Sequence, residues 1–83
     1  MAASAKSTYQ GHKNWDHWNV SLWIFNDEGL YSLARLARSA CPTLDRATER
    51  FIAHAGATHT PDGAKYTKSA VRAALANVER VGL

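Results

Sequence analysis

Three tryptophans in one short segment constrain the fold of this chain more than any other feature of its sequence. The segment NWDHWNVSLWIF, residues 14–25, holds every tryptophan and one of the two phenylalanines. A single domain of 83 residues is close to the lower size limit for folding without metals or disulfides, so its core must be dense. Alanines supply little bulk, and we therefore expect these aromatic side chains to form much of the core.

The spacing of the apolar residues in this segment favours a helix from about Trp15 to Phe25. Asn14 is suited to cap the helix, and Asp16 lies in the first turn, where a negative charge suits the helix dipole. One side of the helix carries an apolar stripe that consists of Trp15, Trp18, Leu22 and Phe25. Val20 and Ile24 fall on nearly the opposite side, so the helix is expected to lie centrally, with other helices on both sides.

Trp23 lies between these two apolar sides, and it is the tryptophan that we expect to remain partly exposed. A β-strand is the alternative for residues 18–25, because apolar residues also alternate here and aromatic and β-branched residues favour sheets. No other segment shows period-two patterning, and a lone strand leaves its backbone groups without partners. We therefore predict a helix.

Two further helices are predicted between residues 26 and 56. The sequence NDEG at 26–29 supplies caps for the first of them, and Pro42 ends it because a residue before proline leaves the helical region. Its apolar face comprises Leu30, Leu33, Ala34, Ala37 and Cys41, with Leu36 and Ala40 at one edge. Thr43 caps the next helix, which Gly56 ends in a left-handed conformation. The apolar face of that helix comprises Leu44, Ala47, Thr48, Phe51 and Ala55.

The last helix follows a turn signal, TPDG at 60–63, and Thr67 is its predicted cap. Its inner stripe comprises Val71, Ala74, Leu75 and Val78. The predicted fold class is therefore all-α, a compact bundle or orthogonal array of about four short helices. Residues 14–83 are expected to form a single helical domain, and residues 1–13 a flexible N-terminal arm.

Recognisable catalytic motifs are missing from the sequence. His17 and Ser21 are four residues apart on the first helix, but a serine nucleophile also needs a group that orients its base and donors for an oxyanion. The four histidines and the single cysteine do not have metal-ligand spacing, and no glycine-rich phosphate-binding motif occurs. We expect no enzyme activity, no cofactor and no metal ion.

The charge and the single cysteine indicate the kind of compartment and partner. The net charge is +3, and the excess of basic residues lies from Ser32 onward, which permits a weakly anionic partner. Cys41 has no second cysteine to pair with and is interpreted as a packing residue at a helix end. No apolar run approaches the roughly 20 residues of a membrane span, and the start MAASAKST lacks the apolar centre of a signal peptide. We expect a cytoplasmic protein without a membrane partner.

Outward-facing basic residues are the best candidate binding feature. Arginine beside an exposed tyrosine can bind carboxylates or phosphates, and both residue types are enriched at interface hot spots. The candidate partner-binding residues are Tyr31, Arg35, Arg38, Arg46, Arg50, Lys68 and Arg72. The alternative interpretation of this set is an ordinary solvated face.

The block YQGHKNWDHWNVSLWIFNDEGLYSLA, from Tyr9 to Ala34, resembles a family of small uncharacterised proteins of bacteriophages and other mobile elements. Its members carry a motif similar to NxxTWxVxLWIxNDExxY. The residues that agree with this motif are Asn14, Trp18, Val20, Leu22, Trp23, Ile24, Asn26, Asp27, Glu28 and Tyr31. His17 stands where the motif has threonine, which puts the capping of the helix start in doubt.

The resemblance implies a mobile-element origin and brings no established activity with it. Small proteins of such elements often bind and block a host machine, as anti-CRISPR and other counter-defence proteins do. The leading hypothesis is therefore a non-enzymatic protein that binds and inhibits a host protein complex, such as a CRISPR or other defence complex.

Two other modes of association follow from the sequence. One is weak, sequence-nonspecific nucleic-acid binding through an arginine-rich helical face, with an affinity that falls steeply with salt. The other is self-association, in which a second copy covers an exposed Trp23 or the second apolar side of the first helix. Both a monomer and a homodimer are compatible with the sequence.

Overall fold

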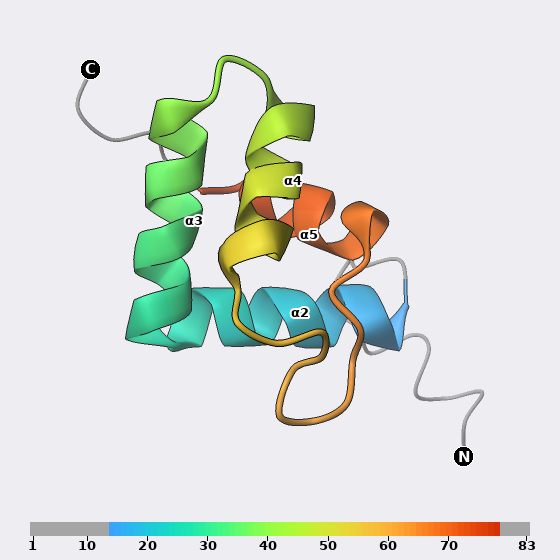
Figure 1. Cartoon of the computed structure of the whole chain (residues 1–83). Helices are drawn as coiled ribbons and strands as arrows, with labels where there is room; N and C mark the ends of the chain where they lie inside the picture. Colours follow the sequence, from blue (N-terminus) through green and yellow to red (C-terminus); the bar gives the residue numbers. More distant parts are fainter. Residues whose placement is uncertain (1–13, 79–83) are drawn as a thin grey trace.

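The computed structural model describes residues 14–78, and the predicted arm at residues 1–13 lies outside the described residues. Within residues 14–78 there are four helices, which confirms the all-α fold class. They are α2 (Trp15–Asn26), α3 (Glu28–Ala40), α4 (Leu44–His54) and α5 (Lys68–Leu75). The helices α3 and α4 stand side by side and antiparallel, α2 lies across one end of this pair, and α5 crosses behind α4 (Figure 1).

Each helix begins at a side chain that accepts a hydrogen bond from a backbone N–H of the first turn. The caps are Asn14, Asp27, Thr43 and Thr67, at donor–acceptor distances of 2.8–3.2 Å. These side chains satisfy N–H groups that have no partner within the helix. The predicted starts of the four helices are confirmed, and Gly56 has the predicted left-handed conformation just after α4, with φ of 82°.

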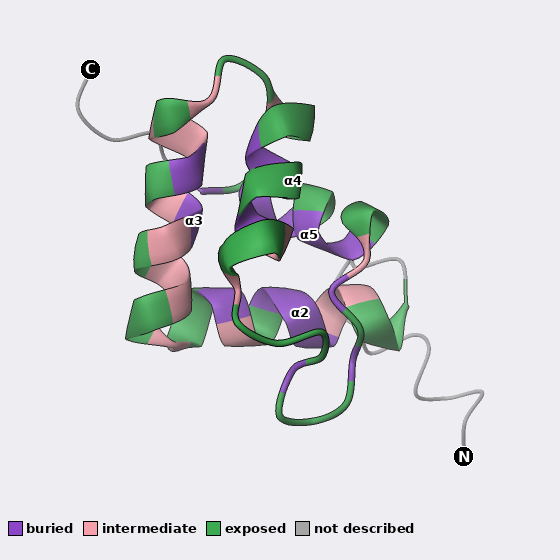
Figure 2. Cartoon of the chain, in the orientation of Figure 1, coloured by how far each residue is buried: buried purple, intermediate pink, exposed green. Residues whose placement is uncertain are grey.

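The core lies where the inner faces of the four helices meet. Its buried apolar residues are Val20, Ile24, Ala34, Ala37, Ala47, Phe51, Ala64, Tyr66, Ala70, Val71, Ala74, Leu75 and Val78. Phe51 has the largest of the fully buried side chains, and the ring of Tyr66 meets it edge to face at a centroid distance of 5.9 Å. Alanines occupy much of the rest, which lets the helices approach closely. The buried residues are purple in Figure 2.

Helix α2 faces the core with the side opposite to the apolar stripe. Val20 and Ile24 are fully buried, whereas Trp15, Leu22 and Phe25 are each 38% exposed. The prediction of a helix is confirmed, but the expectation that the tryptophan-rich side would form the core is wrong. The small side chains on the inner faces of α3, α4 and α5 bring these helices close together, so β-branched side chains fit between them more readily than indoles.

The segment between α4 and α5 is fastened onto α2 by a hydrogen-bond network. The Thr60 hydroxyl donates to Oδ1 of the buried Asn19 at 2.6 Å, and Nδ2 of Asn19 donates to Asp62 at 2.9 Å. The Trp23 indole N–H donates to the same carboxylate oxygen at 2.9 Å. The predicted turn is confirmed, with Gly63 at φ of 98° and its N–H bonded to the Thr60 carbonyl.

The hydrogen-bond network affects the exposure of Trp23 and the pKa of Asp62. Trp23 is half-buried and bonded to Asp62. Trp18 is half-buried too, and Trp15 is exposed at 38%, so the prediction that Trp23 would be the one partly exposed tryptophan is wrong. The Asn19 amide first, and the Trp23 indole second, hold the pKa of the Asp62 carboxyl below its ordinary value. Both donors favour the charged form of the carboxyl.

Candidate functional site

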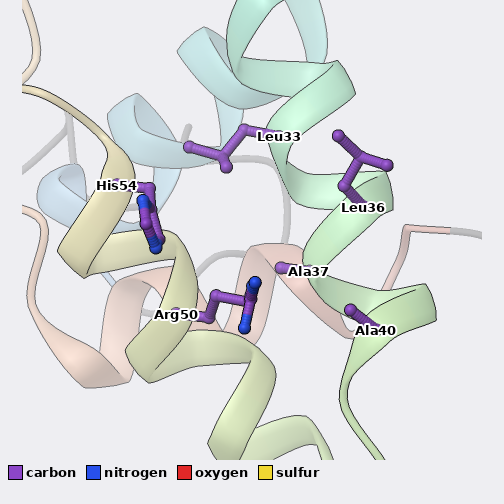
Figure 3. A pocket seen from close by; sticks show the side chains of 6 residues that line it. All are labelled: Leu33, Leu36, Ala37, Ala40, Arg50 and His54. Atoms are coloured by element: carbon purple, nitrogen blue, oxygen red, sulfur yellow. The ribbon is translucent and has the colours of Figure 1, made fainter.

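A groove lies between α3 and α4 on the described surface. Its volume is about 300 Å³. The side chains that line it are Leu33, Leu36, Ala37 and Ala40 from α3, and Arg50 and His54 from α4 (Figure 3). The arginine side chain extends from α4 toward α3, so one wall of the groove is apolar and the other is basic.

Helical spacing explains how the two walls arise. On α3, Leu36 and Ala37 lie three and four positions after Leu33, and Ala40 lies four and three positions after them, which places the lining residues along one side of the helix. Arg50 and His54 are four apart on α4 and therefore lie next to each other. Leu36 is 64% exposed, the highest value among the exposed large apolar side chains. Arg50 makes no ion pair with any residue between 14 and 78.

A second feature continues the apolar stripe of α2 onto α3. The rings of Phe25 and Tyr31 lie 5.7 Å apart between centroids, and the Arg35 guanidinium lies 5.7 Å from the Tyr31 ring centroid. The Arg35 Nε is buried and has no hydrogen-bond partner in the described part of the chain. Tyr31 itself is half-buried against the core, so it is less accessible than the exposed tyrosine that the sequence suggested.

The remaining predicted site residues lie elsewhere. Lys68 pairs with Glu49 at 3.5 Å, and Arg72 pairs with Asp45 at 2.6 Å, so both side chains cross from α5 to α4. On α3, Arg38 donates from Nε to the Val78 carbonyl at 3.4 Å. Arg46 is exposed on α4.

Five of the seven predicted residues are therefore divided among three places, and Arg38 and Arg46 belong to none of them. The three places are the groove with Arg50, the end of the apolar stripe with Tyr31 and Arg35, and the ion-paired contact of α4 with α5. Leu36 and His54 were not among the predicted site residues. The position of Leu36 at the edge of a predicted apolar face was the one signal that pointed to it.

The histidine and serine considered for catalysis are not paired with each other. Nε2 of His17 lies 2.8 Å from the Ser69 hydroxyl, which joins α2 to α5, and Ser21 is buried. Within residues 14–78, no group of three or more histidine, cysteine, aspartate or glutamate side chains is placed to hold a metal ion. None of the helices in that same range is long and apolar enough to cross a bilayer.

The family model of DUF7249, a family of unknown function, matches residues 5–80. The chain belongs to this family. No curated protein and no solved structure matches it. The DUF7249 match includes all four helices, the groove and the apolar stripe, so both surfaces lie within the family domain.

Proposed function

We propose that this DUF7249 chain is a non-enzymatic binding protein that docks on a partner protein through the groove between α3 and α4. The observation that carries the proposal is the combination of a highly exposed Leu36 with an Arg50 that lacks an ion pair in the described structure. Arginine is enriched at interface hot spots, and an apolar side chain that packs beside it helps to exclude water from the contact.

The chemistry of the groove defines the partner segment. Leu33, Leu36 and the small Ala37 and Ala40 fit an apolar side chain, and Arg50 on the facing helix fits a carboxylate next to it. A guanidinium can bind a carboxylate through two parallel hydrogen bonds, which fixes orientation as well as adding affinity. The partner we propose therefore presents an apolar residue followed by an acidic one.

The wider role that we propose is inhibition of a host protein complex, such as a CRISPR or other defence complex, by a phage or mobile-element protein in the host cytoplasm. Its support is the motif from Asn14 to Tyr31 in the sequence, the small size of the chain, and a surface that suits binding. In this role the groove blocks a site of the host complex by occupying it.

Nucleic-acid binding has less support from the geometry. Phosphates would have to displace Glu49 from Lys68 and Asp45 from Arg72 before these side chains could bind a backbone. Among residues 14–78, Arg46 and Arg50 are the members of the predicted set that are exposed without an ion pair. Counterion release by such charges is the main source of affinity for a phosphate backbone. A gel shift at low and high salt tests this function.

Affinity purification from candidate host cells, followed by mass spectrometry, tests the proposal when wild type is compared with Leu36→Glu. The new carboxylate lies in the groove beside apolar residues, and we expect recovery of the partner to fall at least about tenfold, the loss typical of an interface anchor. Ala73→Glu adds the same charge at an exposed position of α5 and is expected to retain the partner. Equal recovery with both variants, or no stoichiometric partner from any host, would refute docking through the groove.

A further inference from the structure

The apolar stripe on α2 has a regularity that the groove does not explain. Its members are separated by three, four and three residues, and this series reads the same from both ends of the helix. At a rise of about 1.5 Å per residue, the midpoint of the stripe lies at the level of Val20. Positions 15 and 25 are equidistant from that level, and so are positions 18 and 22.

A palindromic stripe is what a two-fold symmetric helix pair requires. In such an interface the same surface faces itself, so each residue must meet a suitable residue at the mirrored position. With two copies of α2 antiparallel, Trp15 of one copy meets Phe25 of the second, and Trp18 meets Leu22. Each pair joins a large indole to a smaller apolar side chain, which lets the two surfaces interdigitate.

We propose that a second copy of this chain covers the apolar stripe, with the two α2 helices antiparallel about a two-fold axis at the level of Val20. The ends of the interface support this arrangement. Trp15 of the second copy arrives at Phe25, next to Tyr31 and Arg35. The guanidinium that already faces the Tyr31 ring then gains a second aromatic neighbour.

The exposed area decides how stable this dimer is. Trp15, Leu22 and Phe25 each have 38% of their surface exposed, which leaves roughly 60–95 Å² per residue for side chains of about 150–250 Å². Even with the half-buried Trp18 and Tyr31, each copy offers well below the roughly 800 Å² per partner of a standard interface. The dimer is therefore reversible and weak, with a dissociation constant in the micromolar range or above.

Dimerisation leaves the groove open. Tyr31, at the end of the stripe, and Leu36, in the groove, are five residues apart and lie about 140° from each other around α3. A dimer thus presents two grooves to a partner that has two matching sites, and the second contact would gain from a high effective concentration. Loss of the dimer and loss of partner binding are separable, because they depend on different residues.

Sedimentation velocity of the full chain from about 10 µM to about 1 mM tests the association in the range expected for a weak interface. We expect the wild type to shift from monomer to dimer as the concentration rises. Leu22→Glu, at the centre of the stripe and already part exposed, is expected to remain monomeric throughout. Leu36→Glu, the matched control in the groove, is expected to dimerise like the wild type. A wild type that remains monomeric, or a Leu22→Glu variant that dimerises equally well, would overturn the proposal.

Disulfide cross-linking tests the orientation. In a Cys41→Ala background, an equimolar mixture of Trp15→Cys and Phe25→Cys is expected to form mixed disulfides, because the two positions meet across the axis. Each variant alone is expected to form few, since identical positions are then about 15 Å apart along the helices and a disulfide requires Cα atoms within about 7 Å. Efficient cross-linking of each variant with itself, without mixed products, would contradict the antiparallel arrangement.

Discussion

Asn19 provides the sharpest test of how the structure is held together. Its side chain is buried in α2 and joins that helix to the turn at Thr60 and Asp62, more than forty residues away. Replacement by alanine removes the acceptor of the Thr60 hydroxyl and leaves that donor without its partner inside the protein. We expect Asn19→Ala to destabilise the fold far more than its modest change in apolar area suggests.

The magnitude follows from the Thr60 side of the network. A buried polar group left without its partner costs about 1–3 kcal/mol, more than the net value of about 1 kcal/mol for an ordinary hydrogen bond. The bond to Asp62 is part-buried, and water competes for the exposed carboxylate, so the total rests mainly on the buried bond to Thr60. The expected loss in the free energy of unfolding is about 1–3 kcal/mol, a large fraction of the roughly 4–12 kcal/mol available to a chain of this size.

Urea denaturation followed by tryptophan fluorescence measures this loss directly, because Trp23 lies in the same network. Asn26→Ala is the matched control. That asparagine is exposed and its side chain donates only to the Leu22 carbonyl of its own helix, so we expect a change within about 0.5 kcal/mol. A loss below 0.5 kcal/mol for Asn19→Ala would show that the turn is not fastened to α2 in the way described.

Three further substitutions test separate parts of the structure. Phe51→Ala removes the largest of the fully buried side chains and is expected to lower the free energy of unfolding, measured by urea denaturation, by about 3–5 kcal/mol. Phe25→Ala, on the partly exposed stripe, should lower it clearly less, and equal losses would contradict the burial pattern. Asp27→Ala removes the cap from two N–H groups of α3 and is expected to lower the free energy of unfolding by about 1 kcal/mol. Thermal denaturation should show a lower midpoint, and an unchanged midpoint would contradict the role of this cap. Asp62→Asn tests the lowered pKa of this carboxyl: the charged form stabilises the wild type above about pH 4, and this advantage is lost as protonation proceeds below that pH. The difference in urea midpoint between wild type and variant should therefore be larger at pH 7 than at pH 3, and a difference that does not shrink at pH 3 would refute the assignment.

Local signals in the sequence predicted the local parts of the fold. The caps at Asn14, Asp27, Thr43 and Thr67 act through side-chain contacts within three residues, and the turn at Gly63 depends on its own backbone conformation. Such signals do not depend on the rest of the chain, so the number and starts of the helices could be predicted well.

The orientation of α2 could not be predicted in the same way. Periodicity identifies two apolar sides of this helix, but the choice between them depends on the space left by other helices and on hydrogen-bond partners for Asn19. Those partners, Thr60 and Asp62, are distant in sequence, and no local pattern around them indicates that they bind Asn19. The more bulky side was the natural expectation for the core, and tertiary packing overrode it.

The predicted basic residues likewise divide into those that a single helix places and those that depend on contacts between helices. Helical spacing places Arg35 and Arg38 on one side of α3 correctly, but the partners of Lys68 and Arg72 are set by how α5 crosses α4. The groove at Leu36 likewise arises between two helices, and neither sequence segment alone defines it. The placement of these side chains could be predicted only where a single helix determined it.

The contact of α2 with α5 has a consequence for synthesis of the chain. These two helices come from opposite ends of the described sequence and pack against each other, and half of the eight residues of α5 are buried. An eight-residue helix is not stable by itself in water, and the part of α2 that packs on α5 stays uncovered until α5 arrives. A nascent chain on the ribosome therefore keeps part of the inner side of α2 uncovered until α5 has been synthesised, and premature termination before Lys68 would leave an aggregation-prone fragment in place of a partly working protein.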